Sequence, residues 1–264
     1  MKVLLINGSP RVGGNTSIAL GEMEKIFQQE GIQVETVQVG NKAIRGCVAC
    51  LSCMEKGKCV FDDLVNETAP KFAEADGLVI ASPVYYASAN GTLISFIDRL
   101  FYSTPFDKTM KVGAAVAVAR RGGVSATYDE LNKYFAISGM PIATGQYWNA
   151  VYGREKGEAA QDEEGMQTMR TLARNMTFLM KSIALGTAQF GLPLSEPHVF
   201  THFTRSRSHR TDSSDNKAQF TPTDTLCLFM PCSRPDSALP ADPTKHPADD
   251  GMARRLLLLP APTR

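Results

Sequence analysis

Histidine is nearly absent from this 264-residue chain, and its copies at positions 198, 202, 209 and 246 all lie in the last quarter. The first 197 residues therefore cannot form a Ser-His-Asp or Cys-His catalytic group, nor a metal site built on histidine. If this part of the chain is an enzyme, a cofactor is expected to carry the chemistry.

An excess of one charge and a long apolar run are also missing. The 28 basic and 27 acidic residues give a net charge of +1, which argues against nucleic acid or an acidic membrane as a partner recognised by charge. No apolar run is long enough to span a bilayer, and the chain starts directly with a predicted strand, so we expect no membrane partner and no secretory signal. Six cysteines without an export signal favour a cytoplasmic protein whose clustered thiols bind metal or perform redox chemistry.

Apolar runs that predict strands alternate with helical patterns over about the first 190 residues. Several of the runs are continuously apolar, as in strands covered on both faces by helices. The predicted strands are 2–7, 33–39, 77–82, 112–119 and 141–151, and the predicted helices are 15–29, 63–74, 90–103, 125–138 and 160–185. This alternation predicts an α/β fold with a doubly wound parallel sheet, and a ligand site where the strands end.

The composition changes near Arg205. Eight of the fifteen prolines fall in the last sixty residues, mixed with Ser, Thr, Asp and basic residues. We therefore predict a folded domain over 1–205 and an irregular or disordered tail over 206–264. Cys227 and Cys232, in that tail, have no partner ligands at metal spacing.

The first predicted strand is followed by a loop rich in glycine and hydroxyl groups, Gly8-Ser-Pro-Arg-Val-Gly-Gly-Asn-Thr-Ser17. Unpaired N–H groups at the start of the next helix, its positive dipole end and the hydroxyls of Ser9, Thr16 and Ser17 predict an anion site. No Gly-Lys-Ser/Thr follows the loop, and the second strand ends at Val39 without a carboxylate for a ribose. The pattern favours the phosphate monoester of a mononucleotide; the alternative is a capped polar loop without a ligand.

Two further loops are expected at the same edge of the sheet. The third predicted strand runs into Ser82-Pro-Val-Tyr-Tyr-Ala-Ser-Ala-Asn-Gly91, and we expect it to stop at Pro83, which cannot donate a ladder hydrogen bond. The adjacent tyrosines offer a flat wall for a planar ring, or alternatively pack against a neighbouring subunit. The fourth strand is followed by Arg120-Arg-Gly-Gly-Val124, which brings cationic groups and accessible backbone amides. Together the three loops predict a site shaped for FMN.

These three loops, with Phe-Ile-Asp-Arg99 after the second, resemble the motifs of the flavodoxin-like NAD(P)H-dependent FMN reductases. The resemblance covers about the first 205 residues and implies a five-stranded parallel sheet that binds FMN non-covalently, in a homodimer or tetramer. It implies that the phosphate ligands are Ser9, Arg11, Asn15, Thr16 and Ser17. It implies that Pro83, Val84, Tyr85 and Tyr86 border the isoalloxazine, and that Arg120, Arg121, Gly122 and Gly123 lie at its pyrimidine edge. Ala87 stands where family members often have glycine.

A compact cysteine block follows the second predicted strand: Cys47-x2-Cys50-x2-Cys53-x5-Cys59. Zinc sites usually divide their cysteines into two separated pairs, whereas compact C-x2-C-x2-C runs are typical of [4Fe–4S] ligation. The block resembles that of the iron–sulfur flavoproteins of the same superfamily, although Val60 replaces the proline of ferredoxin-type runs. Three interpretations remain open: a [4Fe–4S] cluster, a zinc ion, or no metal, with thiols that shape a loop over the flavin or react as a redox pair.

Our first functional hypothesis is an FMN-dependent oxidoreductase that takes hydride from NAD(P)H as co-substrate. It would reduce a small acceptor such as a quinone, a flavin, an azo or nitro compound, or a metal ion. No catalytic side chain is assigned, because the flavin carries the reaction and the protein orients it. A second hypothesis is an iron–sulfur flavoprotein electron carrier that exchanges electrons with a ferredoxin-like partner. A third is a flavin-free, flavodoxin-like scaffold for protein interaction.

Overall fold

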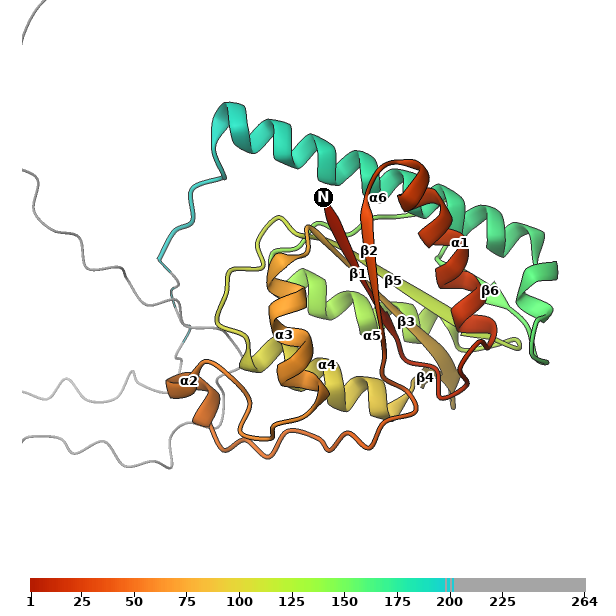
Figure 1. The fold of residues 1–264 in the computed structure, drawn as a ribbon, viewed down its shortest axis with the longest axis horizontal. Coiled ribbons are helices and arrows are strands. Elements are labelled where there is room, and N and C mark those ends of the chain that lie inside the picture. Colours follow the sequence, from red (N-terminus) through yellow and green to blue (C-terminus); the bar gives the residue numbers. More distant parts are fainter. Residues whose placement is uncertain (198, 200, 202–264) are drawn as a thin grey trace, which may run out of the picture. The chain divides into compact units, whose positions relative to one another are not determined.

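A parallel β-sheet lies at the centre of the computed structural model, which describes residues 1–197, 199 and 201 (Figure 1). All neighbours along the main path of the sheet are parallel, and the chain order reverses between β1 and β3, where open α/β sheets bind their ligands. This confirms the predicted α/β, flavodoxin-like fold. In spatial order the strands are β2 (Gln33–Gln38), β1 (Lys2–Asn7), β3 (Gly77–Tyr85), β5 (Val112–Ala119) and β6 (Ala150–Tyr152).

Helices cover both faces of this sheet. One face packs against α1 (Asn15–Gln29) and α6 (Glu163–Phe190). The other packs against α3 (Leu64–Glu74), α4 (Gly91–Ser103) and α5 (Val124–Ile137). The short helix α2 (Ser52–Lys56) and a 3₁₀ turn (Glu158–Gln161) lie in connecting segments.

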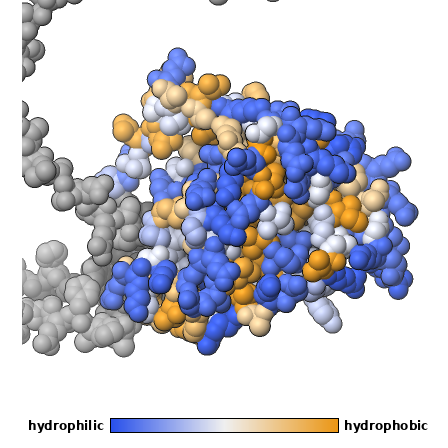
Figure 2. Space-filling view, viewed as in Figure 1, coloured by the Kyte–Doolittle hydropathy of each residue, from blue (hydrophilic) through white to orange (hydrophobic). Residues whose placement is uncertain are grey.

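The continuously apolar strand sequences follow from this two-sided cover. Successive side chains of a strand point to opposite faces, so Leu5 of β1 belongs to the core beneath α1 and α6 while Leu4 belongs to the core beneath α3 to α5. Outward, the helices present polar side chains, and hydrophilic residues cover most of the face shown in Figure 2. No helix in the described part of the chain is long and apolar enough to cross a membrane.

The structure corrects the prediction that the third strand stops at Pro83. β3 continues to Tyr85: Pro83 stays in register with Val118 of β5, and the next two residues pair antiparallel with the short strand β4 (Ser88–Ala89). Proline loses only its N–H, so its backbone can remain in a ladder where that donor is not required.

Other boundaries differ by less. The last predicted strand, 141–151, is reduced to β6 with a single earlier bridge between Gly113 and Ile142, and α6 ends five residues beyond the predicted 185. The predicted tail over 206–264 and its boundary with the domain lie outside the described residues.

Glu22 of α1 joins this helix to α6 and gives the fold a pH-dependent contact. Its carboxylate pairs with Arg170 at 2.7 Å and with Lys25 at 2.9 Å, and hydrogen bonds from first Arg170 and then Lys25 lower the pKa of Glu22. A carboxylate with a lowered folded pKa stabilises the fold above its unfolded pKa, and this contribution is lost as the pH falls through the folded value.

Glu22→Gln is therefore expected to reduce stability at pH 7 by about 0.5–1 kcal/mol, and to make the loss of stability below about pH 5 shallower. Urea unfolding of both proteins across this pH range measures the difference. Profiles that stay parallel down to acid pH would show that the pair does not contribute.

Candidate functional site

The loop after β1 is drawn tightly against the end of β3. The Gly8 N–H donates to the Ala81 carbonyl at 2.8 Å, and a Cβ on Gly8 would lie 2.6 Å from Cδ2 of Leu93 at the start of α4. Only glycine allows this approach. The loop thus lies at the carboxyl end of β1, as predicted, and the strand order places this end at the β1–β3 switch point.

Asn7, the last residue of β1, fixes both ends of this loop. Its side chain is 2% exposed; Nδ2 donates to Ser17 Oγ and Oδ1 accepts from the Ser9 N–H, both at 3.0 Å. The sequence analysis missed Asn7. Its signal was a polar residue at the end of an otherwise apolar strand.

The start of α1 faces the same loop without a side-chain cap. Gly14 occupies the N-cap position with no side-chain hydrogen bond, and no acidic residue lies in the first turn. Ser9 and Thr16 are buried beside it, whereas Arg11 is exposed at the rim. The N–H groups of the first turn and the positive end of the helix dipole therefore remain for an anion.

The side chain of Asn15, which was predicted to bind the phosphate, instead hydrogen-bonds to the segment after β6. Its Nδ2 donates to the Glu155 carbonyl at 2.9 Å, and its Oδ1 accepts from the N–H groups of Gly157 and Ala159 at 3.0 and 3.3 Å. The side chain is thus directed at the segment after β6. That segment brings Lys156 Nζ to 3.9 Å from the position that a Cβ on Gly13 would take, which adds a cation that the sequence analysis did not assign to the site.

The second loop is a tight hairpin between β3 and β4. Its central residues, Tyr86 and Ala87, have φ values of 50° and 61°, the left-handed geometry of a two-residue hairpin turn that normally favours Asn or Gly. Glu130 of α5 holds the hairpin by accepting from the Ser88 hydroxyl at 2.7 Å and the Ala89 N–H at 2.9 Å. Strained backbone of this kind is common at functional sites.

The third loop touches the second. Gly123 has a φ of 92°, and a Cβ there would lie 2.6 Å from the Ala87 Cα, so glycine is required for the contact. Arg120 and Arg121 are exposed beside it, and Tyr85 and Tyr86 are exposed on the hairpin, the latter completely. Pro83 and Val84, at the base of the hairpin, are half-buried, and Gly122 is exposed.

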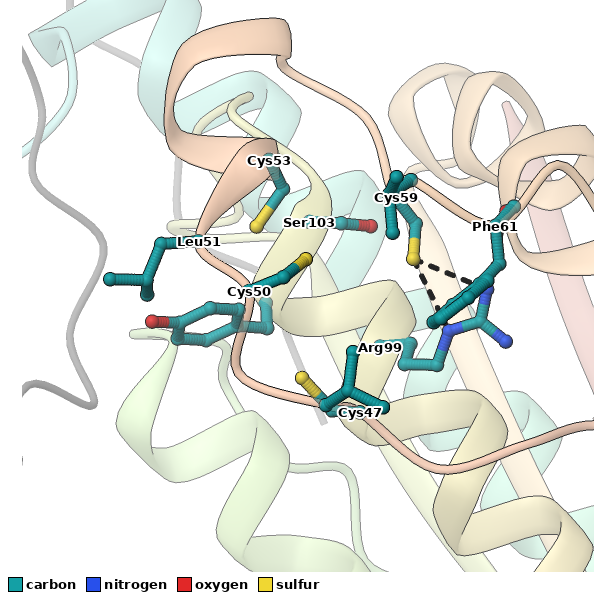
Figure 3. Close-up of a pocket in the computed structure, with 11 residues that line it drawn as sticks. Cys47, Cys50, Leu51, Cys53, Cys59, Phe61, Arg99 and Ser103 are labelled. Carbon is teal, nitrogen blue, oxygen red and sulfur yellow. Dashed lines mark hydrogen bonds between the residues drawn. The ribbon is translucent and has the colours of Figure 1, made fainter.

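The four cysteines of the block line one pocket at the side of α4. Their sulfurs point into the space between them, above side chains of α4 that include Arg99 and Ser103 (Figure 3). Positive φ values at Ala49 and Leu51 turn the backbone between the cysteines, so that residues three apart face the same space. The predicted ligands are therefore brought together; Cys47 and Cys50 are exposed, and Cys53 and Cys59 are half-buried.

Hydrogen bonding and burial shift the pKa values of two of the thiols in opposite directions. Hydrogen bonds from the Ser52 backbone and then its hydroxyl lower the pKa of Cys50, whereas burial raises the pKa of Cys53, helped by the charges of the other three cysteines. Thiolates this close repel one another, and this repulsion is relieved when a cationic group binds among them.

The donors of this pocket are four thiols from one compact segment, the ligand type of iron–sulfur clusters. In the described residues, no three His, Cys, Asp or Glu side chains converge closely enough to hold a single metal ion. A zinc site needs four ligands at about 2.0–2.3 Å from one point, whereas an iron–sulfur cluster takes one thiolate at each of several separate iron atoms. The Ser103 hydroxyl is 4% exposed, lines the pocket and has no hydrogen-bond partner, so a buried polar atom there is left for a bound group. The donor set fits an iron–sulfur cluster.

Helix α4 connects the two regions. Leu93, in its first turn, lies against Gly8 of the phosphate loop, while Arg99 and Ser103 lie beside the cysteines. At 1.5 Å per residue, the cysteine pocket begins about 9 Å along the helix from that contact.

Comparison with known proteins agrees with this geometry. Residues 1–154 match the family model described as NADPH-dependent FMN reductase. An iron–sulfur flavoprotein of Methanocaldococcus jannaschii is 34% identical over 194 residues, which cover 69% of this chain and 99% of the relative. An iron–sulfur flavoprotein of Methanosarcina thermophila is 31% identical over 193 residues, 69% of this chain and 97% of the relative.

Solved structures agree on the fold. The crystal structure of RosB superposes with a TM-score of 0.55 at 15% identity, covering 84% of this chain and 98% of RosB. The chain therefore belongs to the NADPH-dependent FMN reductase family and is an FMN-dependent oxidoreductase of flavodoxin-like fold.

Proposed function

We propose that this protein is an iron–sulfur flavoprotein, which holds FMN on the three loops and a [4Fe–4S] cluster on Cys47, Cys50, Cys53 and Cys59. The observation that carries this proposal is that four thiols line one pocket, together with a buried arginine and an unpaired hydroxyl. Relatives that match along almost their full length are named iron–sulfur flavoproteins, which supports it. When bound, the cluster supplies transfer of single electrons, and FMN supplies exchange between one- and two-electron steps.

The first loop holds the FMN phosphate. With FMN bound, the Ser9 hydroxyl and the N–H groups of the first turn of α1 would donate to the phosphate oxygens, and the positive side chains of Arg11 and Lys156 would balance the phosphate charge. Asn15 contributes its backbone N–H and uses its side chain to position the segment that carries Lys156. Thr16 and Ser17, in the first turn of α1, are the remaining two of the five predicted phosphate ligands.

The other two loops orient the flavin ring. The hairpin from Pro83 to Tyr86, which Glu130 holds, would border the isoalloxazine, and Arg120 to Gly123 would lie at its pyrimidine edge. Backbone N–H groups of this segment and the guanidinium groups of Arg120 and Arg121 would supply positive charge at that edge. No general base is required.

The cysteine segment holds the cluster through thiolates that its own backbone positions. Asn66 of α3 fixes Cys59 by accepting from its N–H and donating to its carbonyl, both at 3.0 Å. Ser103 offers a buried hydroxyl donor to the bound group. In this function a ferredoxin-like partner supplies the electrons, and a small molecule accepts them.

A second candidate function is the reduction of FMN by hydride from NAD(P)H, with a quinone, flavin, azo or nitro compound as acceptor. The family model that matches residues 1–154 favours this candidate. It needs the three flavin loops but not the cysteine pocket.

The absorption spectrum of protein purified without oxygen, with iron and acid-labile sulfide assayed on the same sample, tests the proposal. We expect flavin bands over a broad visible shoulder and about four irons per chain. Flavin bands without iron would overturn the cluster and leave the reductase. Rapid mixing with NADH, NADPH or a reduced ferredoxin then identifies the electron donor, and a colourless protein that ignores added FMN would overturn both functions.

Ser9→Ala is expected to weaken FMN binding by about 1.5–3 kcal/mol, because a buried charge-assisted hydrogen bond to the phosphate is lost. Riboflavin affinity should stay the same, since riboflavin has no phosphate. Fluorescence titration of the apoprotein with both flavins measures this, with Ser138→Ala at the C-terminal end of α5 as the control. Equal losses for both flavins would place the phosphate elsewhere.

A further inference from the structure

One arginine holds the cysteine block to the body of the fold. The side chain of Arg99, on α4, is 1% exposed, and a buried guanidinium costs several kcal/mol unless it is paired and fully hydrogen-bonded. Asp63 provides the pairing, with Nη1 to Oδ2 at 2.7 Å and Nη2 to Oδ1 at 3.0 Å. This two-pronged ion pair, together with hydrogen bonding to Cys59, keeps the pKa of Arg99 raised against the effect of burial, so Arg99 stays charged.

The remaining donors of Arg99 reach both ends of the block. Nη1 donates to the carbonyl of Arg45, two residues before Cys47, and Nη2 donates to the carbonyl of Phe61, two residues after Cys59, both at 3.3 Å. The guanidinium also lies 5.2 Å from the centre of the Phe61 ring. Because Phe96, Ile97 and Leu100 anchor α4 in the core, these contacts fix where the segment leaves and rejoins the domain.

The same side chain touches one of the proposed ligands directly. Nε and Nη2 of Arg99 donate to the Cys59 Sγ at 3.3 and 3.2 Å, as the dashed lines in Figure 3 show. The sulfurs of Cys50 and Cys53 lie across the pocket from Cys59 in Figure 3. Among the four proposed ligands, Cys59 therefore lies directly against the positive charge of Arg99.

We propose that Arg99 is a positioning residue that holds Cys59 as a ligand and, with Asp63, sets the reduction potential of the cluster; this rests on the proposed function. Hydrogen bonds to a cluster sulfur and positive charge nearby favour the reduced, more negative form and raise the potential. Asp63 places a carboxylate against the same guanidinium and offsets part of this effect. The two residues therefore act on the potential with opposite signs.

Potentials measured in two charge variants test this. In an electron-spin-resonance titration of the holoprotein, Arg99→Gln should lower the cluster potential and Asp63→Asn should raise it. Each shift should correspond to at least a tenfold change in the reduction equilibrium, about 59 mV for one electron. The FMN potential, followed by absorbance in the same samples, should stay constant and report that the flavin site is intact. Arg99→Lys, which keeps the charge, should recover part of the loss.

A purely structural role for Arg99 predicts a different pattern. Both variants would then shift the potential in the same direction, or leave it unchanged, and either result would overturn the proposal. Matching the two variants matters because each removes the same ion pair while changing the local charge in opposite directions.

Labelling of the metal-free proteins with iodoacetamide provides a second measurement, which does not depend on a cluster. Read by mass spectrometry, the labelling rate at Cys59 should rise at least tenfold in Arg99→Gln, whereas the exposed Cys47 and Cys50 should keep their wild-type rates. An unchanged rate at Cys59 would overturn the positioning role. Wild-type protein without iron would instead contradict the proposed function, and this labelling comparison would still decide whether Arg99 holds Cys59.

Discussion

Gly40→Ala is expected to reduce FMN affinity at least about 100-fold, or 2.7 kcal/mol, although residue 40 lies outside the phosphate motif. A Cβ at this position would lie 2.1 Å from the Gly8 carbonyl oxygen and 2.3 Å from the Ser9 carbonyl carbon. Both are backbone atoms that cannot rotate away. The loop after β2 or the phosphate loop must shift, and the phosphate donors shift with it.

The same clash should lower the free energy of unfolding by about 1–3 kcal/mol, the usual range for overpacking. Two hydrogen bonds near this contact are also at risk: the Gly40 N–H donates to the Asn7 carbonyl at 3.3 Å, and the Gln38 side chain donates to the Ser9 carbonyl. Flavin fluorescence titration measures the affinity, and urea unfolding measures the stability.

Gly21→Ala is the matched control. Gly21 lies inside α1, and apart from the helix's own backbone and the adjacent residues nothing lies within 4 Å of a Cβ placed there. Removing a glycine from a helix interior should stabilise the fold by about 0.5–1 kcal/mol and leave FMN affinity unchanged. If Gly40→Ala bound FMN as tightly as Gly21→Ala, the anion site could not be the loop after β1.

Local sequence signals were sufficient for the elements that frame the site. β1, α1 and β5 begin and end where the sequence predicted, because apolar runs and a glycine-rich loop mark these boundaries within a few residues. The Pro83 prediction failed because a local rule about a missing donor was applied without knowing which neighbours the strand would pair with. The fifth predicted strand was overestimated because an apolar run does not show how many of its residues pair with a neighbouring strand; here only Ile142 and β6 pair with β5.

The residues that position the site could not be found locally. Asn15 meets its partners about 140 residues further along the chain, Glu130 meets the hairpin about 40 residues before it, and Arg99 meets Cys59 across 40 residues. Each of these contacts depends on the sheet order, which brings distant loops to one edge. Spacing within the chain identified the cysteine donors. Arg99, which brings positive charge beside them, was noted in the sequence only as part of the Phe-Ile-Asp-Arg motif.

Cys53→Ser is the substitution expected to separate the two proposed functions. A serine hydroxyl is a hard, poorly acidic ligand, so the cluster site should fall from about four irons per chain to fewer than about one. FMN content should stay near wild type, since the phosphate loop lies against the first turn of α4 and the cysteine pocket lies near its C-terminal end. Cys227→Ser, outside the block, is the control, and iron, sulfide and flavin assays on anaerobically purified protein give the readout.

The activity of Cys53→Ser then decides which electron donor the molecule uses. If electrons enter through the cysteine pocket, the variant should keep its flavin yet lose reduction by a ferredoxin-like donor. If hydride enters directly at the flavin, reduction by NAD(P)H should proceed at the wild-type rate, because the hairpin from Pro83 to Tyr86 and the segment from Arg120 to Gly123 are untouched. A variant that keeps its iron would show that Cys53 is not a cluster ligand.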